Sequence, residues 1–331
     1  MDISTNKTEW GISLKEEREI WTKKFLKVLI PIPDKCNICK TGVIYIRNNN
    51  SINNPLLGKC NNYKCQRQIY LRIGTIFEKF NKTPASVLFN ILKIWLFEEN
   101  NVSKTINILE NKYKIEKLNK NLVYKFVEYL RTIIANYIRS IYILEPLSNE
   151  NSSQHIAVDE SLFTHNGGTS QWVIGLINTQ SNVIRLEIVN SRDAQTLKTI
   201  LEKHVLKGNI IISDLWGGYN FLNNPYSGYT HLSFNHARGH FGNGIDSTSR
   251  IEGVWGELKH LLKKLYSTIR PKNFVYFLRE IEYRRMTKFL KLEEKIGNFG
   301  IAVACVGNGE NEKFLTENEL LSYEYETMFD D

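Results

Sequence analysis

The sequence lacks any apolar run near the roughly 20 residues that a helix needs to span a bilayer. Its first ten residues are polar and do not form the apolar core of a signal peptide. Cysteine is scarce too, with five residues in 331. These absences argue against a membrane protein and against a secreted disulfide scaffold. We therefore expect the chain to stay in a reducing compartment, where its cysteines are thiols or metal ligands.

Acidic side chains are the minority charge, with 35 Asp and Glu against 43 Lys and Arg and a net charge of +8. Residues 308–331 hold eight acids and one lysine, a contribution of −7, so the rest of the chain carries +15. That balance favours a polyanionic partner, with nucleic acid as the first candidate. The acidic segment is predicted to be a disordered tail; the alternatives are that it shields the basic surface or binds a partner.

Four of the five cysteines form two closely spaced pairs. The first pair is a Cys-x-x-Cys knuckle and four residues separate the second pair; the pairs are Cys36 with Cys39 and Cys60 with Cys65. Four thiolates arranged in this way can close a tetrahedral Zn²⁺ site, which suits a small β-ribbon with little core. The alternative is four unrelated buried or free cysteines. We predict a structural zinc in a zinc-ribbon-like domain at 31–80, with strands at 42–47 and 68–77, after a helical lead-in at 1–30. Cys305 is predicted to be a core residue.

Residues 81–146 follow as a helical region that we predict to bind DNA. Thr83-Pro84 offers an N-cap and a first-turn proline for an apolar helix at 85–97. A short helix at 103–109 and a longer one at 121–144 come next. If these two form a helix-turn-helix, the longer helix would enter a DNA groove with a set of basic and aromatic side chains. That set is Tyr124, Lys125, Tyr129 and Arg131. The alternative is a helical bundle with solvated lysines.

The pattern changes from helical to alternating after a linker at 146–153. Alternating or apolar runs predict five strands, at 155–158, 171–178, 183–190, 209–213 and 229–234. Asp193 is placed to cap a helix that ends at Val205, and apolar residues at helical spacing predict a long helix that includes Ile251–Leu265. Strands and helices in this order indicate an α/β domain at 154–290.

Three carboxylates are predicted to lie at one edge of the sheet of that domain. Asp159 and Asp214 follow two strands, and Glu252 lies in the first turn of the long helix. Taken singly, Asp214 is also explained as a helix N-cap and Asp159 as a turn residue. Together they would repel one another at the carboxyl ends of the strands unless they bind cations. Oxygen ligands suit Mg²⁺ or Mn²⁺, and two ions roughly 3.5–4 Å apart can promote phosphodiester cleavage. Lys259 shares the helix face of Glu252, and Lys263 falls beside it.

Several short motifs stand in a fixed order along the chain. They are Val158-Asp159-Glu160-Ser161, Gln171-Trp172-Val173-Ile174-Gly175, Ser213-Asp214-Leu215-Trp216-Gly217-Gly218-Tyr219, Asn235-His236 and Ile251-Glu252-Gly253-Val254-Trp255-Gly256-Glu257-Leu258-Lys259. With the stretch 72–78 after the cysteine pairs, they resemble the transposases of the IS1595/ISXO2 group, whose eukaryotic relatives are the Merlin DNA transposons. The resemblance runs from the cysteine ribbon through Arg285.

This resemblance implies an RNase H-like catalytic core with a DDE triad at Asp159, Asp214 and Glu252 that holds two Mg²⁺ or Mn²⁺ ions. Lys259 corresponds to the family's signature lysine, which contacts DNA. Lys263 and Arg250 would hold phosphates beside it. Where the family has His-Thr before the glutamate, this chain has Ser247-Thr248. The role of that histidine is therefore lost or passes to His236 or His240.

The implied activity is cut-and-paste transposition, in which terminal inverted repeats in double-stranded DNA are cleaved and their 3′-hydroxyl ends are joined to target DNA. Synapsis of two ends implies a homo-oligomer, at least a dimer in the active complex. Two alternatives are a DNA-binding or regulatory host protein derived from a transposase, and another RNase H-like nuclease. The expected location is the nucleus of a eukaryote, or the cytoplasm and nucleoid of a prokaryote.

Overall fold

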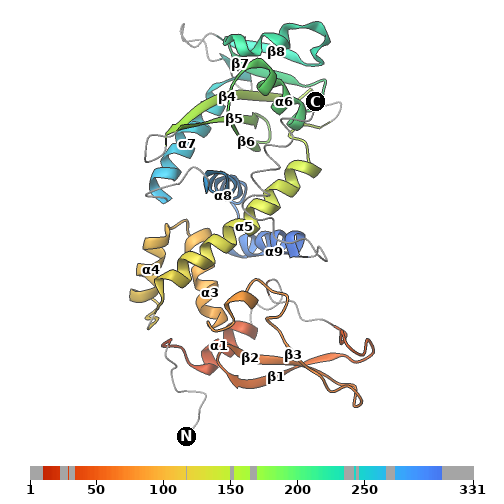
Figure 1. Cartoon of the computed structure of the whole chain (residues 1–331), viewed down its shortest axis with the longest axis vertical. Coiled ribbons are helices and arrows are strands. Elements are labelled where there is room, and N and C mark those ends of the chain that lie inside the picture. The colour runs from red at the N-terminus through yellow and green to blue at the C-terminus, as the bar shows by residue number, and fades with distance from the viewer. Residues whose placement is uncertain are drawn as a thin grey trace. The chain divides into compact units, whose positions relative to one another are not determined.

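The computed structural model of the chain describes residues 10–22, 29, 34–116, 118–149, 153–164, 170–234, 242–243, 246–265 and 273–307. The chain divides into two compact units, Met1–Ile133 with Leu290–Asp331 and Ile134–Phe289, both drawn in Figure 1. We call the first the ribbon–helix unit and the second the sheet unit. No helix within the described ranges is long and apolar enough to cross a membrane. The acidic segment 308–331 lies outside these ranges.

The ribbon–helix unit begins with α1 (Leu14–Thr22) and a three-stranded antiparallel sheet in the order β1-β2-β3. The strands are β1 (Ile44–Ser51), β2 (Asn54–Cys60) and β3 (Gln68–Tyr70). β1 and β2 form a hairpin, so the polar residues that follow Arg47 lengthen the first strand. Most side chains of β1 are exposed, which is why its polar half carries no apolar alternation in the sequence.

The strand predicted at 68–77 is wrong beyond Tyr70, because the chain there turns around a buried arginine. Arg72 is 2% exposed, and its guanidinium donates to four backbone carbonyls. These belong to Asn53, Phe77, Phe80 and Thr83. Burial lowers the pKa of Arg72 to about 10. A buried cation must be satisfied by hydrogen bonds, and supplying four carbonyls bends the chain into turns and the short helix η1 (Glu78–Phe80).

The helices of this unit are α3 (Ala85–Leu92), the π-helical η2 (Lys93–Phe97), α4 (Val102–Asn111), α9 (Leu292–Gly307) and the first part of α5 (Lys120–Leu144). The helices predicted at 85–97, 103–109 and 121–144 are thus confirmed within two residues at each end. No helix was predicted at the position of α9. Its Phe299 packs edge-on against Phe97 with ring centroids 6.4 Å apart, so the chain returns to this unit after the sheet unit.

The sheet unit is built on five strands in the order β6-β5-β4-β7-β8. The strands are β4 (His155–Thr164), β5 (Ser170–Asn178), β6 (Ile184–Val189), β7 (Ile210–Asp214) and β8 (Thr230–Phe234). β4, β7 and β8 pair in parallel, whereas β5 and β6 are antiparallel additions beside β4. The predicted α/β class is confirmed, with a mixed sheet.

Helices cover both faces of this sheet (Figure 1). α7 (Ser249–Leu265) and α8 (Phe274–Met286) pack on the face that carries Ala157 and Ile212. α6 (Ala194–His204), capped by Asp193 as predicted, packs on the face that carries Val158 and Ile211. The short helices η3 (Gly217–Asn223) and η4 (Pro225–Ser227) follow β7, and the two-residue strands β9 (Gly242–Asn243) and β10 (Asp246–Ser247) precede α7.

A buried ion cluster links the elements of the sheet unit. Glu187 of β6 contacts His204 of α6 at 2.7 Å and Arg279 of α8 at 3.3 Å. Arg279 also pairs with Glu282 at 3.0 Å, and Tyr142 near the end of α5 donates to the same carboxylate. Each of these charged groups is almost fully buried, so the unit contains a polar core beside its two apolar ones.

Candidate functional site

Asp159 and Asp214 lie level with one another on neighbouring parallel strands. β4 and β7 pair in register as far as Ala157 and Ile212, and each acid stands two residues further along its strand. Because side chains alternate across a strand, both acids share the face of Ala157 and Ile212. That face is the one that α7 covers. The register alone therefore brings two of the three predicted acids to one place.

The prediction that Asp159 ends its strand is wrong. β4 runs on to Thr164 because it stays paired with β5 beyond the parallel part of the sheet, whereas β7 ends at Asp214. Asp159 thus lies at the edge of the parallel sheet but within a continuous strand. The Oδ1 atom of Asp214 accepts from the amide of Trp216 at 2.9 Å, so this acid also closes a local turn.

Trp255 of α7 holds Asp159 in place. Its Nε1–H donates to Asp159 Oδ2 at 2.8 Å. The indole reaches the strand because residue 175, the β5 partner of Asp159, is glycine. A Cβ on Gly175 would lie 2.5 Å from Trp255 Cη2 and 3.1 Å from Ile251 Cδ1. The glycine therefore makes room for the group that orients the acid.

The three acids share an electrostatic environment. Burial raises the pKa of Asp159 above its usual value, and the charges of Asp214 and Glu252 raise it further, while the bond from Trp255 opposes the shift. Within the described ranges, only the cysteines form a set of three or more metal-ligating side chains with all ligand atoms within 4.8 Å of one another. The acids thus lie near enough to interact, but they do not form a closed ligand set of that kind.

Glu160 is an acid next to the site for which the sequence predicts no role. It follows Asp159 on β4, so it faces the opposite side of the sheet, where the hydroxyl of Tyr219 donates to its carboxylate. Burial raises the pKa of Glu160 to about 7, with added contributions from Asp159 and Asp214. Arg192 acts in the opposite direction and stacks between Trp172 and Trp216, at 4.4 and 4.6 Å from their ring centroids. The signal in the sequence was a second acid directly beside the first.

The three predicted DNA-binding side chains do not gather at one point. Lys259 is exposed and its Nζ lies 5.7 Å from the ring centroid of Phe163, which is beyond Asp159 on β4. Lys263 is exposed one turn further along α7. Arg250 instead donates to Asn182 Oδ1 at 2.9 Å, in the turn between β5 and β6. His236 and His240 lie outside the described residues.

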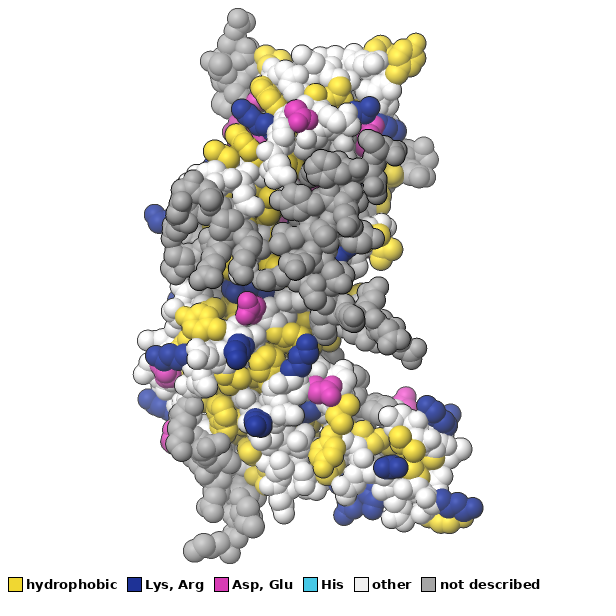
Figure 2. All heavy atoms as spheres, viewed as in Figure 1, with side chains coloured by type: hydrophobic (Ala, Val, Ile, Leu, Met, Phe, Trp, Pro, Cys, Tyr) yellow, Lys and Arg dark blue, Asp and Glu magenta, His cyan; other side chains and the backbone are white. Residues whose placement is uncertain are grey.

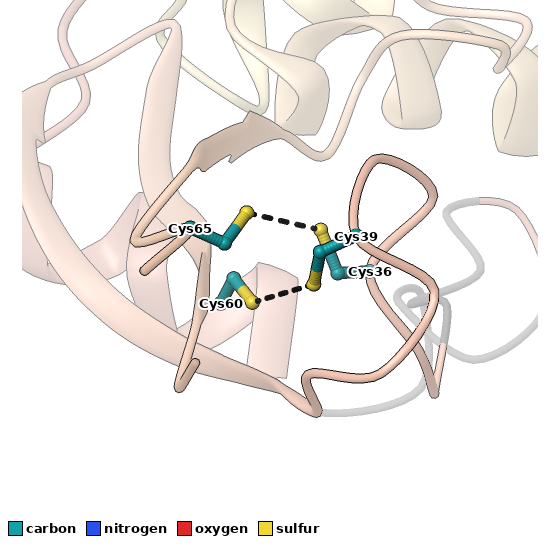
Figure 3. Close-up of side chains that lie close together, drawn as sticks. All are labelled: Cys36, Cys39, Cys60 and Cys65. Carbon is teal, nitrogen blue, oxygen red and sulfur yellow. Dashed lines mark hydrogen bonds between the residues drawn. The ribbon is translucent and has the colours of Figure 1, made fainter. Parts of the chain in front are cut away.

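The four paired cysteines come together as predicted (Figure 3). Their ligand atoms all lie within 4.8 Å of one another, with Cys36 Sγ 3.8 Å from Cys65 Sγ and Cys39 Sγ 3.7 Å from Cys60 Sγ. Figure 3 shows the sulfur atoms of Cys36 and Cys39 facing those of Cys60 and Cys65. Such a set of thiols has the donor type and number of a structural Zn²⁺ site. Cys305 is exposed, so the prediction that it lies in a core is wrong.

Gly42 supports the cysteine cluster in two ways. Its amide donates to Cys39 Sγ at 3.3 Å, and this bond and those from Thr41 lower the pKa of the Cys39 thiol to about 6. It also has no side chain to obstruct the cluster, because a Cβ there would lie 2.2 Å from Cys60 Sγ. Burial raises the pKa of Cys60 to about 12. Thiolate is the form that binds a metal, and the cluster already favours it at Cys39.

Residues 149–285 match a family model described as the ISXO2-like transposase domain. No curated protein is significantly similar to the chain. Among solved structures, the HTLV-2 integrase catalytic core domain in complex with magnesium (dimeric form) matches at 13% identity over 50% of this chain and 94% of that chain, with a TM-score of 0.25. The catalytic core domain of BIV integrase matches at 13% identity over 54% of this chain and 100% of that chain, also with a TM-score of 0.25. These structural likenesses are too slight to carry an argument.

Proposed function

Because its residues 149–285 place this chain among the ISXO2-like transposases, as their motifs predict, we propose that it is a DDE transposase with an RNase H-like core. Asp159, Asp214 and Glu252 form its catalytic triad. The observation that carries this assignment is the shared register of the two aspartates on the face that α7 covers. Glu252 on α7 and Asp214 both raise the pKa of Asp159, so the three charges act on one another.

The donor set fits divalent cations. Carboxylate oxygens are the ligands that Mg²⁺ and Mn²⁺ prefer, and the mutual repulsion of the acids is relieved when a cation binds between them. Asp159, Asp214 and Glu252 would hold the metal. When bound, two such ions supply Lewis acidity to the phosphodiester and stabilise the charge that develops on it.

The remaining residues position the acids and the DNA. The indole of Trp255 fixes one oxygen of Asp159, and the amide of Trp216 fixes one oxygen of Asp214. Lys259 and Lys263 project from exposed positions of α7 and hold backbone phosphates. Arg250 does the same once it releases Asn182.

Two phosphoryl transfers follow at this site. Water attacks a phosphodiester at a terminal inverted repeat, so that a P–O bond breaks and a 3′-hydroxyl is freed. That hydroxyl then attacks a phosphodiester of target DNA, and the displaced strand end leaves as a new 3′-hydroxyl. Two ends must be held together for insertion, so the active complex contains at least two copies of the chain. The cysteine cluster binds a structural Zn²⁺ in the amino-terminal ribbon.

The test is cleavage of a supercoiled plasmid that carries the element's own terminal repeats, with Mg²⁺ or Mn²⁺ present. We expect nicks at the repeat ends from the parental chain and none above background from Asp214→Asn. Asp193→Asn is the matched control, because Asp193 caps α6 away from the triad and Asn caps helices equally well. The control should therefore cleave at the parental rate.

Two results would point to the alternatives. Tight binding of the repeats by both chains without cleavage would indicate a retained DNA-binding protein. Metal-dependent cleavage that ignores the repeats would indicate another RNase H-like nuclease. If Asp214→Asn cleaved as fast as the parental chain, the triad assignment would fail.

A further inference from the structure

A compact helix–turn–helix lies earlier in the ribbon–helix unit than the sequence analysis placed it. η2 ends at Phe97 and α4 begins at Val102, so four residues connect them. By contrast, residues 112–119 separate α4 from α5, the helix that we expected to enter DNA. The two helices of a DNA-binding helix-turn-helix are joined by a short turn. With η2 as the end of the first helix, α4 is the second helix of such a pair.

The turn between η2 and α4 is fixed by its own side chains. Asn100 is buried, and its Nδ2 donates to the carbonyls of Ile94 at 3.1 Å and Glu98 at 3.3 Å. Asn101 Oδ1 caps α4 by accepting from the amide of Lys104 at 2.7 Å. Glu99 adopts φ of +53°, the left-handed conformation that a sharp reversal requires. The entry of α4 is therefore held rigidly.

α4 has one buried face and one polar, exposed face. The buried residues are Val102, Thr105, Ile106 and Leu109, and they pack the helix against its own unit. The exposed residues are Ser103, Lys104, Asn107 and Asn111. Asn107 and Asn111 are one turn apart, and the Nδ2 of Asn111 donates to Asn107 Oδ1 at 3.1 Å and to its carbonyl at 3.0 Å. The outer face thus presents two mutually oriented amides next to a lysine.

The chemistry of this face suits the major groove of duplex DNA. An asparagine amide matches the N6 and N7 edge of adenine, with one donor and one acceptor. The bond between the two asparagines leaves each with unused donor or acceptor capacity. Lys104 is exposed beside them, whereas Glu110, the acid of α4, is half-buried and lies 3.9 Å from Lys120. Figure 2 shows further Lys and Arg side chains scattered over the ribbon–helix unit.

We propose that α4 is a base-reading helix, in which Asn107 and Asn111 contact the edges of A·T pairs and Lys104 contacts a phosphate. This inference rests on the proposed function in one respect, that duplex DNA is the partner. It goes further by locating sequence recognition in the ribbon–helix unit, on a helix distinct from α5 and outside the sheet unit.

The test is selection of binding sites by the full-length chain from duplexes with a randomised central segment, without divalent metal. The parental chain should enrich a motif that contains A·T pairs. Asn107→Ala and Asn111→Ala should lose discrimination at one or two adjacent positions of that motif, where each good contact is worth about 5- to 150-fold. Lys104→Ala should weaken binding to all sequences alike and reduce the slope of log affinity against log salt by about one.

The matched control is Asn121→Ala, the same substitution at an exposed position of α5. It should leave the motif unchanged. If Asn121→Ala altered the motif and the α4 variants did not, α5 would be the reading helix and the proposal would be wrong. An unchanged motif in both α4 variants, with unfolding curves that match the parent, would equally overturn it and leave the face of α4 for a protein partner.

This readout is independent of strand chemistry. Asp214→Asn should select the same motif as the parental chain. If the parental chain cleaves the repeats and the α4 variants select the parental motif, only the base-reading inference is wrong. If the α4 variants select a changed motif and the parental chain never cleaves, only the proposed transposase activity is wrong.

Discussion

Trp255 contacts or carries three features of the proposed catalytic site at one position of the sheet. Its Nε1–H holds Asp159, its ring fills the space above Gly175, and its helix carries Glu252. Because Asp159 and Gly175 are direct partners across β4 and β5, a shift of the indole moves the acid relative to the sheet. In the proposed catalytic site, Trp255 is therefore a positioning residue, whose effect on DNA cleavage passes through Asp159.

Trp255→Phe should slow cleavage while DNA binding is retained. Phenylalanine fills most of the same volume above Gly175 but has no N–H to donate to Asp159. Losing an outer partner of a metal-binding carboxylate typically costs about 10- to 100-fold in activity or metal affinity. We expect the single-turnover rate to fall by that factor, partly recovered at high Mg²⁺, with the dissociation constant for the repeat duplex unchanged.

Trp172→Phe is the control for this experiment. Trp172 lies on β5 as well, but its side chain belongs to the face that α6 covers. The same change there should leave the metal dependence of cleavage at the parental value. An equal loss in both variants, without a shift in metal dependence, would mean that Trp255 matters only for packing.

At the scale of elements, the cysteines make up most of one apolar cluster of the ribbon. That cluster consists of Cys36, Ile44 and Cys60, with Cys39, Cys65 and Ile69 against it. Four of those six residues are the candidate zinc ligands. A metal that joins the four thiols would therefore hold this end of the ribbon together, while Leu56 and Leu57 of β2 are buried outside the cluster.

Cys60→Ser should therefore lose the metal and unfold the ribbon. We expect bound zinc to fall from about one ion per chain to none, and proteolysis to cut between β1 and β3 at concentrations that spare the parental chain. Cys305→Ser is the matched control, since that thiol is exposed and apart from the cluster. Full zinc content in Cys60→Ser, or equal protease sensitivity in both variants, would contradict a structural site.

Elements with a clear period were predictable from the sequence, whereas elements fixed by distant partners were not. The strands of the sheet unit and helices α3 to α7 follow their apolar patterns. The turn after Tyr70 depends on carbonyls that reach Arg72 from residues 53 to 83. α9 has a buried face of Ile296, Phe299 and Ala302, but Phe97, the partner of Phe299, lies 202 residues earlier in the chain.

The same distinction applies to the candidate site. Asp159, Asp214 and Glu252 were predicted because each belongs to a short motif that the sequence places at a strand or helix end, although Asp159 lies within β4 in the structure. The contact of Trp255 with Asp159, and the need for glycine at 175, arise from the register between β4 and β5. No spacing along the chain encodes that register. The break at 98–101 before α4 was predicted, but its tight geometry was not, because that geometry depends on the amide of Asn100 being buried.

At the scale of the whole sheet unit, the buried ion cluster is the tie between β6, α6 and α8. Burial alone would raise the pKa of Glu187, but the bond with His204 and the charges of Arg279 and Lys203 lower it on balance. A carboxyl whose folded pKa lies below its unfolded value of about 4.3 stabilises the fold above that pH. The stabilisation is lost as the pH falls towards the folded pKa.

Glu187→Gln should therefore destabilise the chain in a pH-dependent way. At pH 7 we expect a loss of about 3–5 kcal/mol in the free energy of unfolding, because the variant removes one of the two carboxylates that pair with the buried Arg279. The difference from the parental chain should narrow below about pH 4.3. Urea unfolding at a series of pH values measures it, and comparison at each pH removes contributions common to both chains.

Glu202→Gln serves as the control, because Glu202 pairs with Lys207 at 2.8 Å on the surface. An exposed pair contributes at most about 1 kcal/mol, and we expect little change with pH. If the Glu187→Gln difference persisted unchanged in acid, the stabilisation would come from packing or neutral hydrogen bonds rather than from the carboxylate.

The distribution of charge over the whole chain leads to a last prediction. Residues 308–331 contribute −7 to a chain whose remainder carries +15. Replacing the eight acids of this segment by their amides raises the net charge from +8 to +16. Affinity for generic duplex DNA should then rise at low salt, because more positive charge attracts the phosphates. The gain should vanish near 1 M salt, where the screening length is about 3 Å.

Deletion of residues 308–331 tests whether this segment acts through its charge or by covering a surface. The deleted chain carries +15, almost the same net charge as the amide variant. If the acids of this segment weaken DNA binding through their charge alone, the two variants should gain the same affinity for duplex DNA. Both should lose that added affinity at the same salt concentration. A gain from deletion that the amide variant lacks, and that persists at high salt, would mean that the segment physically covers a DNA-binding surface. Equal affinity of both variants and the parental chain at low salt would show that the acids do not influence DNA binding.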